Sequence, residues 1–117
     1  MGNERAWITL HHKPLSGIHK KELIEECGTP EAVLDLTGME IARITEEKSP
    51  AIAQFRRTRV DCARIERSMR KHGIEIIPFT HEHYPPLLRE IPDAPALLYA
   101  LGDTSVLTRR SLSIVGS

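Results

Sequence analysis

Apolar residues in the first 72 positions recur three or four residues apart, a spacing that places them on one face of a helix. Trp7, Ile8 and Leu10 form the first such patch and predict a helix over residues 4–12. Pro14 would end this helix, because proline lacks the backbone N–H and its ring clashes with the preceding turn. The chain is therefore expected to begin as a helix.

Helix-capping residues divide the next segment into further short helices. Ser16 can cap a helix over residues 17–26, and Gly28 is a natural stop at its C-terminus. Thr29-Pro30 offers a capping hydroxyl and a proline at the first helical position. The segment 37–40, Thr-Gly-Met-Glu, fits a capping box, in which the glutamate reaches back to the N–H of the cap residue. We therefore expect three short helices to follow the first.

The longest predicted helix covers residues 49–72. Ser49-Pro50 repeats the signal of a cap followed by proline, and Gly73 would end the helix. Its buried stripe would consist of five apolar residues: Ile52, Phe55, Cys62, Ile65 and Met69. Thr58 or Arg59 interrupts this stripe.

From residue 74 onward the pattern changes to short apolar runs of strand length. Strands are expected at residues 73–78, 96–101 and 111–115. Five of the eight prolines fall between residues 78 and 95, so this segment cannot be one long helix, although a turn or two can form. A boundary near Gly73 therefore predicts a helical domain over residues 1–72 and a second domain over residues 73–117.

The composition is that of a folded protein, with 40% apolar and 27% charged residues and a net charge of zero. No apolar run approaches the roughly 20 residues that a membrane span needs. The N-terminus also lacks the pattern of a secretory signal. Cys27 and Cys62 stand far apart in no metal-ligand spacing, so we expect free thiols in a cytoplasmic protein without membrane contact.

Several short motifs follow one another in a fixed order along residues 73–117. They are Gly73 through Ile77, Tyr84-Pro85-Pro86-Leu87-Leu88, Ile91-Pro92-Asp93-Ala94-Pro95, Leu97-Leu98-Tyr99 with Gly102, and Ile114-Val115-Gly116-Ser117. In order and spacing they resemble the DNA-processing protein A (DprA/Smf) family. Gly17-Ile18 and the run from Cys27 to Leu34 are similar to segments of the same family, so the resemblance covers nearly the whole chain.

The resemblance implies a fold and a role. The fold would be an α-helical N-terminal domain, SAM-like with a helix-hairpin-helix character, followed by the first strands of a truncated Rossmann-like α/β domain. Members of the family bind and protect single-stranded DNA and help load recombinase RecA in natural transformation, usually as homodimers. The resemblance implies no enzyme activity, no cofactor and no metal. We expect the printed chain to lack the complete binding site and to bind single-stranded DNA weakly or undetectably.

The end of the last predicted strand is the first candidate site. A buried strand that enters glycine begins the first turn of a Rossmann-type fold, where backbone N–H groups at the next helix bind phosphate. Gly116 and Ser117 would be the first edge of such a site, and the family continues there with an arginine. The alternative is an ordinary turn at the end of a strand.

The second candidate site is the basic segment 50–72, which holds seven basic residues against two acidic ones. On one continuous helix, Arg57, Arg64 and Lys71 would form a line at intervals of seven residues. Such a line could neutralise DNA phosphates, and each contact would steepen the salt dependence of binding. The alternative is a solvated helix surface.

The hairpin at residues 14–19 is the third candidate. Helix-hairpin-helix modules grip phosphates with backbone N–H groups of a glycine-rich turn. Relatives show glycine-isoleucine-glycine at this turn, whereas His19 replaces the second glycine here. The departure favours a structural turn over a phosphate contact.

Other residues of functional type are given structural roles. His81-Glu82-His83 lacks a further ligand at zinc spacing, so surface-loop positions are expected. Tyr84, which precedes two prolines, is predicted to be a packing anchor between the two domains.

Other functional classes remain open. A Rossmann-like nucleotide-processing enzyme of the phosphoribohydrolase type would show a glycine-rich loop with a catalytic arginine and glutamate beyond residue 117. A helical protein-interaction module would fold as residues 1–73 and bind a protein but no DNA. A remnant without independent activity would expose apolar strand edges.

Overall fold

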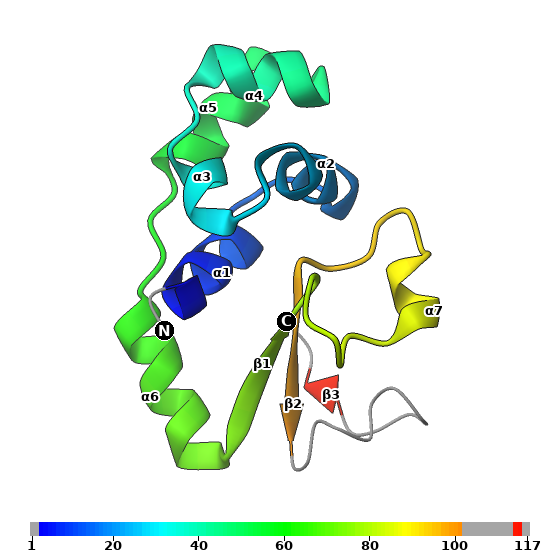
Figure 1. Ribbon diagram of the computed structural model, residues 1–117. Helices are drawn as coiled ribbons and strands as arrows, with labels where there is room; N and C mark the ends of the chain where they lie inside the picture. The colour runs from blue at the N-terminus through cyan, green and yellow to red at the C-terminus, as the bar shows by residue number, and fades with distance from the viewer. Residues whose placement is uncertain (1–2, 102–113, 116–117) are drawn as a thin grey trace.

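The computed structural model describes residues 3–101 and 114–115, in which seven helices and three strands form (Figure 1). Along the chain these are α1 (Asn3–His12), α2 (Gly17–Cys27), α3 (Pro30–Leu34), α4 (Gly38–Thr45), α5 (Ser49–Arg57), α6 (Cys62–His72), β1 (Ile74–Pro78), α7 (Pro86–Arg89), β2 (Leu97–Leu101) and β3 (Ile114–Val115). A helical region thus precedes one that mixes strands with a short helix. This order is compatible with the expected helical domain followed by the start of an α/β domain. The division at Gly73 stays a prediction.

The predicted caps set the boundaries of the first helices. Ser16 accepts a hydrogen bond from the backbone N–H of His19, and Thr29 accepts one in the same way at the start of α3. The capping box at Thr37 is also confirmed, because Glu40 and Thr37 each accept from the other's backbone N–H. Gly28 ends α2 at a φ of 87°, which glycine adopts without the strain that a side chain would bring.

The prediction of a single helix over residues 49–72 is wrong. The segment forms two helices: α5 ends at Arg57, Thr58 is extended with a ψ of 129°, and α6 begins at Cys62. The ammonium group of Lys13 donates to the carbonyls of Phe55 and Thr58 at 3.0 and 2.8 Å, which satisfies the open end of α5.

The start of α5 also differs from its prediction. The N-cap is Lys48, which makes no side-chain cap bond, and Ser49 is already helical. The sequence therefore predicted the proline in the first turn correctly, whereas the N-cap lies one position before the predicted Ser49. Asp61, which the sequence reading did not single out, caps α6 through the backbone N–H of Arg64 at 3.1 Å.

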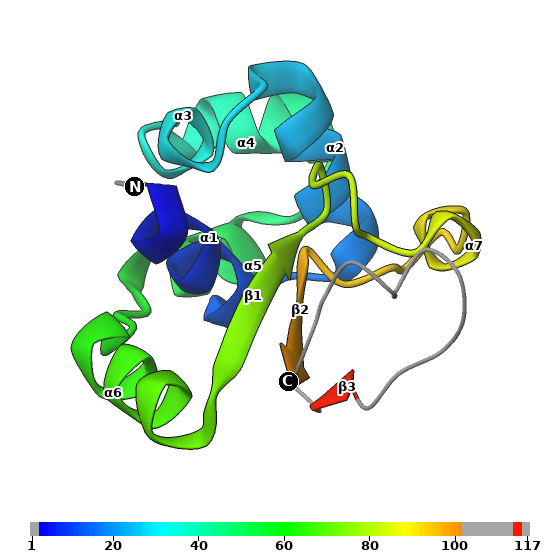
Figure 2. The same cartoon turned by 60° about the horizontal axis from the view of Figure 1, so that its bottom comes forward.

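The three strands form one sheet in the order β1-β2-β3. Both pairings are antiparallel, with Ile76 opposite Tyr99 and Tyr99 opposite Val115. In both ribbon views the sheet lies between α6 on one side and α7 on the other (Figures 1 and 2). The described strands contain no parallel pair, so the Rossmann-like name also stays a prediction.

One apolar core runs through the helices and the sheet. Its most buried members come from both regions: Ile8, Leu10, Leu23, Val33, Ile41, Ile77 and Leu97. Helix α1 occupies the centre and packs against α3, α6 and β2. The helical region is therefore fixed against the first strands by apolar burial, which is the main stabilising term in folding. Within the described residues, no helix is long and apolar enough to cross a membrane.

Tyr84 is a fully buried anchor, as expected, but its described contacts lie within the second half of the chain. Its hydroxyl donates to the carbonyl of Pro95 at 2.9 Å. Its ring packs edge-on against Phe79, with ring centres 5.3 Å apart. These bonds stabilise the loops on either side of α7 and do not bridge the two regions.

Candidate nucleic-acid interface

The turn between α1 and α2 is docked against the loop that precedes β2. The carboxylate of Asp93 accepts a hydrogen bond from the backbone N–H of Ile18 at 3.2 Å. A Cβ atom on Gly17 would lie 2.7 Å from the carbonyl oxygen of Ala94, closer than real Cβ atoms approach. Glycine is therefore needed here for close packing of one backbone on another.

This docking decides between the two readings of the hairpin. The N–H of Ile18 is used by Asp93, and the N–H of His19 by the Ser16 hydroxyl. The His19 ring contacts carboxylates of Glu22 and Glu47 at 2.8 and 3.4 Å. The turn thus offers carboxylates and occupied donors where a phosphate would need free N–H groups, and we interpret it as a structural turn.

Polar side chains of α1 and α2 line the seam beside this turn, and Lys20 is the buried one among them. The Lys20 ammonium donates to the carbonyl of His11 at 2.7 Å, and His12 shares a 2.7 Å hydrogen bond with the Tyr99 hydroxyl. Burial lowers the pKa of His11 to about 4 and the pKa of Lys20 to about 8, although Asp93 acts to raise the latter. The seam therefore favours neutral His11, and its His12–Tyr99 bond joins the helical region to β2.

The predicted line of basic residues lies on two helices. Arg57 is in the last turn of α5, whereas Arg64 and Lys71 are on α6. All three side chains are exposed, and none makes a side-chain hydrogen bond or ion pair within the described residues. Because the chain is extended between the helices, the spacing of seven no longer places Arg57 in line with the other two. Their role in DNA binding stays a prediction.

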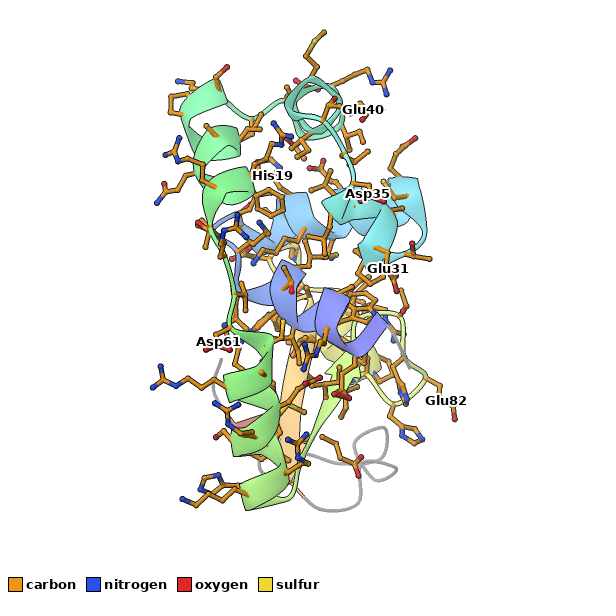
Figure 3. All side chains as sticks on the ribbon, turned by 90° about the vertical axis from the view of Figure 1, so that its left-hand side faces the viewer. His19, Glu31, Asp35, Glu40, Asp61 and Glu82 are labelled. Carbon is orange, nitrogen blue, oxygen red and sulfur yellow. The ribbon has the colours of Figure 1, made fainter. Side chains whose placement is uncertain are left out.

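The break between α5 and α6 instead creates a cation-lined groove, which opens over about 610 Å³. Its lining consists of Thr9, Lys13, Arg56, Arg57, Thr58, Arg59 and Val60. Burial lowers the pKa of Lys13, and the positive charges of Arg59 and Arg56 lower it further. Figure 3 faces this side of the molecule, with the extended segment between α5 and α6 close to the labelled Asp61.

Sequence reasoning missed the part that Lys13 plays in this groove. Lys13 follows α1 and lies 42 residues before Phe55, so no helical periodicity could connect them. The one usable signal was the interruption of the apolar stripe near Thr58, where the helix in fact ends.

Gly116 and Ser117 lie outside the described residues. The histidines at positions 81 and 83 are on a loop, where the backbone N–H of His83 donates to the His81 ring at 3.0 Å. Among the described residues, no group of three histidine, cysteine or acidic side chains is arranged to hold a metal ion.

Comparison with known proteins bears on the second half of the chain. Residues 75–117 match the family model described as DNA recombination-mediator protein A. The DNA processing protein DprA of Bacillus subtilis (strain 168) is 40% identical over 55 residues. That alignment covers 46% of this chain and 18% of the relative, so the chain spans only a small part of the relative's length. No solved structure matches.

Proposed function

Because this chain belongs to the DNA-processing protein A family, which its residues 75–117 match, we propose that its full-length protein binds and protects single-stranded DNA and helps load recombinase RecA during natural transformation. The observation that carries this proposal is the family match over the segment from β1 onward. The role is one of binding, so the proposal includes no catalytic step and no cofactor.

The structure supports the proposal through the residues that join the matched segment to the helices. Asp93 and Tyr99 both lie within residues 75–117, and each makes a hydrogen bond to the helical region, to Ile18 and His12 respectively. The matched segment is thus held at a defined position against the helices. A fixed arrangement lets basic groups on both regions act on one DNA strand without an added ordering cost.

The finer fold assignment belongs to the same proposal. We assign residues 1–72 to a SAM-like domain and residues 73–117 to the start of a Rossmann-like domain that continues in the full-length protein. Gly116 and Ser117 would open its phosphate-binding turn. Arg57, Arg64 and Lys71 would add phosphate contacts from the helical domain, and the full-length protein would act as a homodimer.

A nuclease-protection assay tests the binding half of the proposal. A labelled single-stranded oligonucleotide is exposed to a single-strand exonuclease with and without the full-length protein. The proposal predicts slower digestion as the protein concentration rises, and unchanged digestion of a duplex by a double-strand exonuclease. Equal digestion of the single strand at all protein concentrations would contradict it.

The RecA half is tested separately. RecA hydrolyses ATP only after it assembles on single-stranded DNA, and a bound single-strand-binding protein delays this assembly. When the full-length protein is added at a concentration that saturates the DNA, the delay before RecA begins to hydrolyse ATP should become shorter. A delay that is unchanged, with DNA binding intact, would remove RecA loading from the proposal and leave DNA binding in place.

A further inference from the structure

Two hollows meet at the C-terminal end of α5. The first is the cation-lined groove described above. The second, of about 340 Å³, shares Lys13, Arg56 and Arg57 with the first as lining residues. Its other lining residues are apolar and come from three helices and the α3–α4 turn: Val33, Leu34, Leu36, Ile41 and Phe55. Of these, Leu34 and Leu36 are half-buried and supply the accessible apolar face, whereas the other three are almost fully buried. A charged hollow and an apolar hollow thus share one cationic rim.

The rim carries positive charge, and among the residues that the structure describes no carboxylate balances it. Of those residues, no acidic one lines either hollow. The nearest acid along the linker is Asp61, which accepts the Arg64 N–H as the cap of α6. Within the described part of the chain, the side chains of Arg57 and Arg59 make no hydrogen bond or ion pair. Unpaired cations that converge on one groove form a site for an anion.

Lys13 and the arginines have different parts in this site. The three N–H donors of Lys13 are directed to the carbonyls of Phe55, Arg56 and Thr58, at 3.0, 3.4 and 2.8 Å. Its ammonium therefore contributes charge but no free donor. Arg57 and Arg59 keep their guanidinium donors available, and a guanidinium can bind two phosphate oxygens at once.

We propose that the two hollows together form a nucleotide site for single-stranded DNA on the helical region. A backbone phosphate binds Arg57 and Arg59 in the cation-lined groove, and the adjoining base enters the apolar hollow beside Leu34 and Leu36. The inference rests on the proposed function and adds a second contact surface, separate from the turn at Gly116-Ser117.

The apolar hollow selects single strands over duplexes. In a duplex the bases are stacked and paired, so only phosphates would reach the surface, whereas an unpaired base can leave the stack and bury its ring. The described lining contains no exposed aromatic ring, since Phe55 is only 2% exposed. The base is therefore held by burial against aliphatic side chains, and little preference among the four bases is expected.

A matched pair of double variants tests the phosphate part. Binding of a fluorescein-labelled oligothymidylate by the full-length protein is followed by fluorescence anisotropy over a range of salt concentrations. Arg57→Gln/Arg59→Gln removes two charges from the groove. Arg67→Gln/Arg70→Gln removes two exposed charges from α6 that make no described bond or ion pair and do not line the groove.

The groove variant should bind roughly tenfold more weakly or worse, because charge-assisted hydrogen bonds to phosphate are lost. Its plot of log K against log salt should also be shallower by about 0.7, the value for one phosphate contact on a single strand. The α6 variant should lose less affinity and keep the slope within about 0.3. Circular dichroism of both variants checks that each remains folded.

An abasic oligonucleotide of the same length tests the base part without a mutation. It keeps the phosphates and lacks the rings, so the wild-type protein should bind it several-fold more weakly than oligothymidylate, with the same salt slope. Equal affinity for the two would overturn the apolar half of the site. Polyglutamate represents an acidic protein partner and is added as a competitor of the DNA. If it displaces the DNA at an equal concentration of charge, the nucleotide site is also overturned.

The outcomes separate this inference from the function on which it rests. If the wild-type protein binds oligothymidylate and the groove variant binds it equally tightly with an unchanged slope, the inference is overturned and the function stands. If the wild-type protein does not bind single-stranded DNA at all, both are overturned.

Discussion

The carboxylate of Asp93 accepts a hydrogen bond from the backbone N–H of Ile18, although 75 residues separate the two along the chain. Ile18 lies in the first turn of α2, where backbone N–H groups have no helical partner and the helix dipole favours a negative charge. The loop that leads into β2 therefore supplies the charge that the N-terminus of α2 lacks. Together with the His12–Tyr99 bond and the shared core, this side chain fixes the helical region against the segment that matches the family.

Gly17→Ala tests the close approach that this contact requires. A Cβ atom there would meet the carbonyl oxygens of Ala94 and Asp93 at 2.7 and 2.8 Å, and backbone atoms cannot move aside cheaply. We expect a loss of about 1–3 kcal/mol in the free energy of unfolding, as for an overpacked site. Urea denaturation followed by circular dichroism measures it.

Gly38→Ala is the matched control. Gly38 is the first residue of α4, and a Cβ atom there would make only ordinary contacts, the nearest at 3.7 Å. Its free energy of unfolding should be unchanged or higher by a few tenths of a kcal/mol, because alanine favours helix more than glycine does. Equal losses for the two variants would contradict the packing argument.

Asp93→Ala should lower the free energy of unfolding by about 0.5–1.5 kcal/mol, because it removes both a hydrogen bond and a charge at a helix N-terminus. Asp93→Asn keeps an acceptor oxygen and should lose less. The difference between the two variants should shrink in high salt, which screens the charge. A double-mutant cycle with Gly17→Ala should be non-additive, since the two changes disturb one contact.

Lys13→Met tests the cation at the end of α5. The apolar stem is kept, whereas the carbonyls of Phe55 and Thr58 lose their donor. A loss of about 1–2 kcal/mol in the free energy of unfolding is expected from the cap and the helix dipole. Lys71→Met, at an exposed position of α6, should leave it within about 0.5 kcal/mol. No difference between the two variants would contradict the capping role.

The stability of the fold should depend on pH through His11. Burial holds its folded-state pKa at about 4, against 6.5 for an unperturbed histidine. Between these values the unfolded chain binds more protons than the folded chain does, so stability falls as the pH is lowered from about 6.5 towards 4 and is fully present above 6.5.

His11→Gln should make this dependence shallower. Urea midpoints of the wild-type protein and the variant at pH 7.5 and pH 5 give the comparison. Carboxylates contribute equally to the two proteins in this range. A His11→Gln variant with the wild-type dependence would contradict a buried neutral His11.

The local signals in the sequence predicted the short helices well, and the tertiary contacts determined the rest. Ser16, Thr29 and Thr37 cap their helices because a capping bond joins residues only three positions apart. The break after Arg57 depends on Lys13, which is remote in the sequence, so a helical pattern alone extended the helix through it. Pairing of β1 with β2 likewise joins residues that the pattern places in separate runs.

The candidate sites were less predictable for the same reason. The sequence identified Arg57 as a basic residue on a helix, but its grouping with Lys13 and Arg59 arises only where α5 ends. The hairpin glycine at position 17 fits a phosphate-binding turn by composition, whereas the fold uses it to pack against Asp93 and Ala94. In both cases the sequence identified the residue type that matters, but it did not predict which residue would be its partner in the fold.

Direct binding of DNA by the full-length protein tests the central claim most closely. Fluorescence anisotropy of a labelled oligothymidylate and of a duplex with the same number of phosphates is measured side by side at low salt. The account predicts tighter binding of the single strand, with an affinity that falls steeply as salt is added. No binding of the single strand, or tighter binding of the duplex, would contradict it.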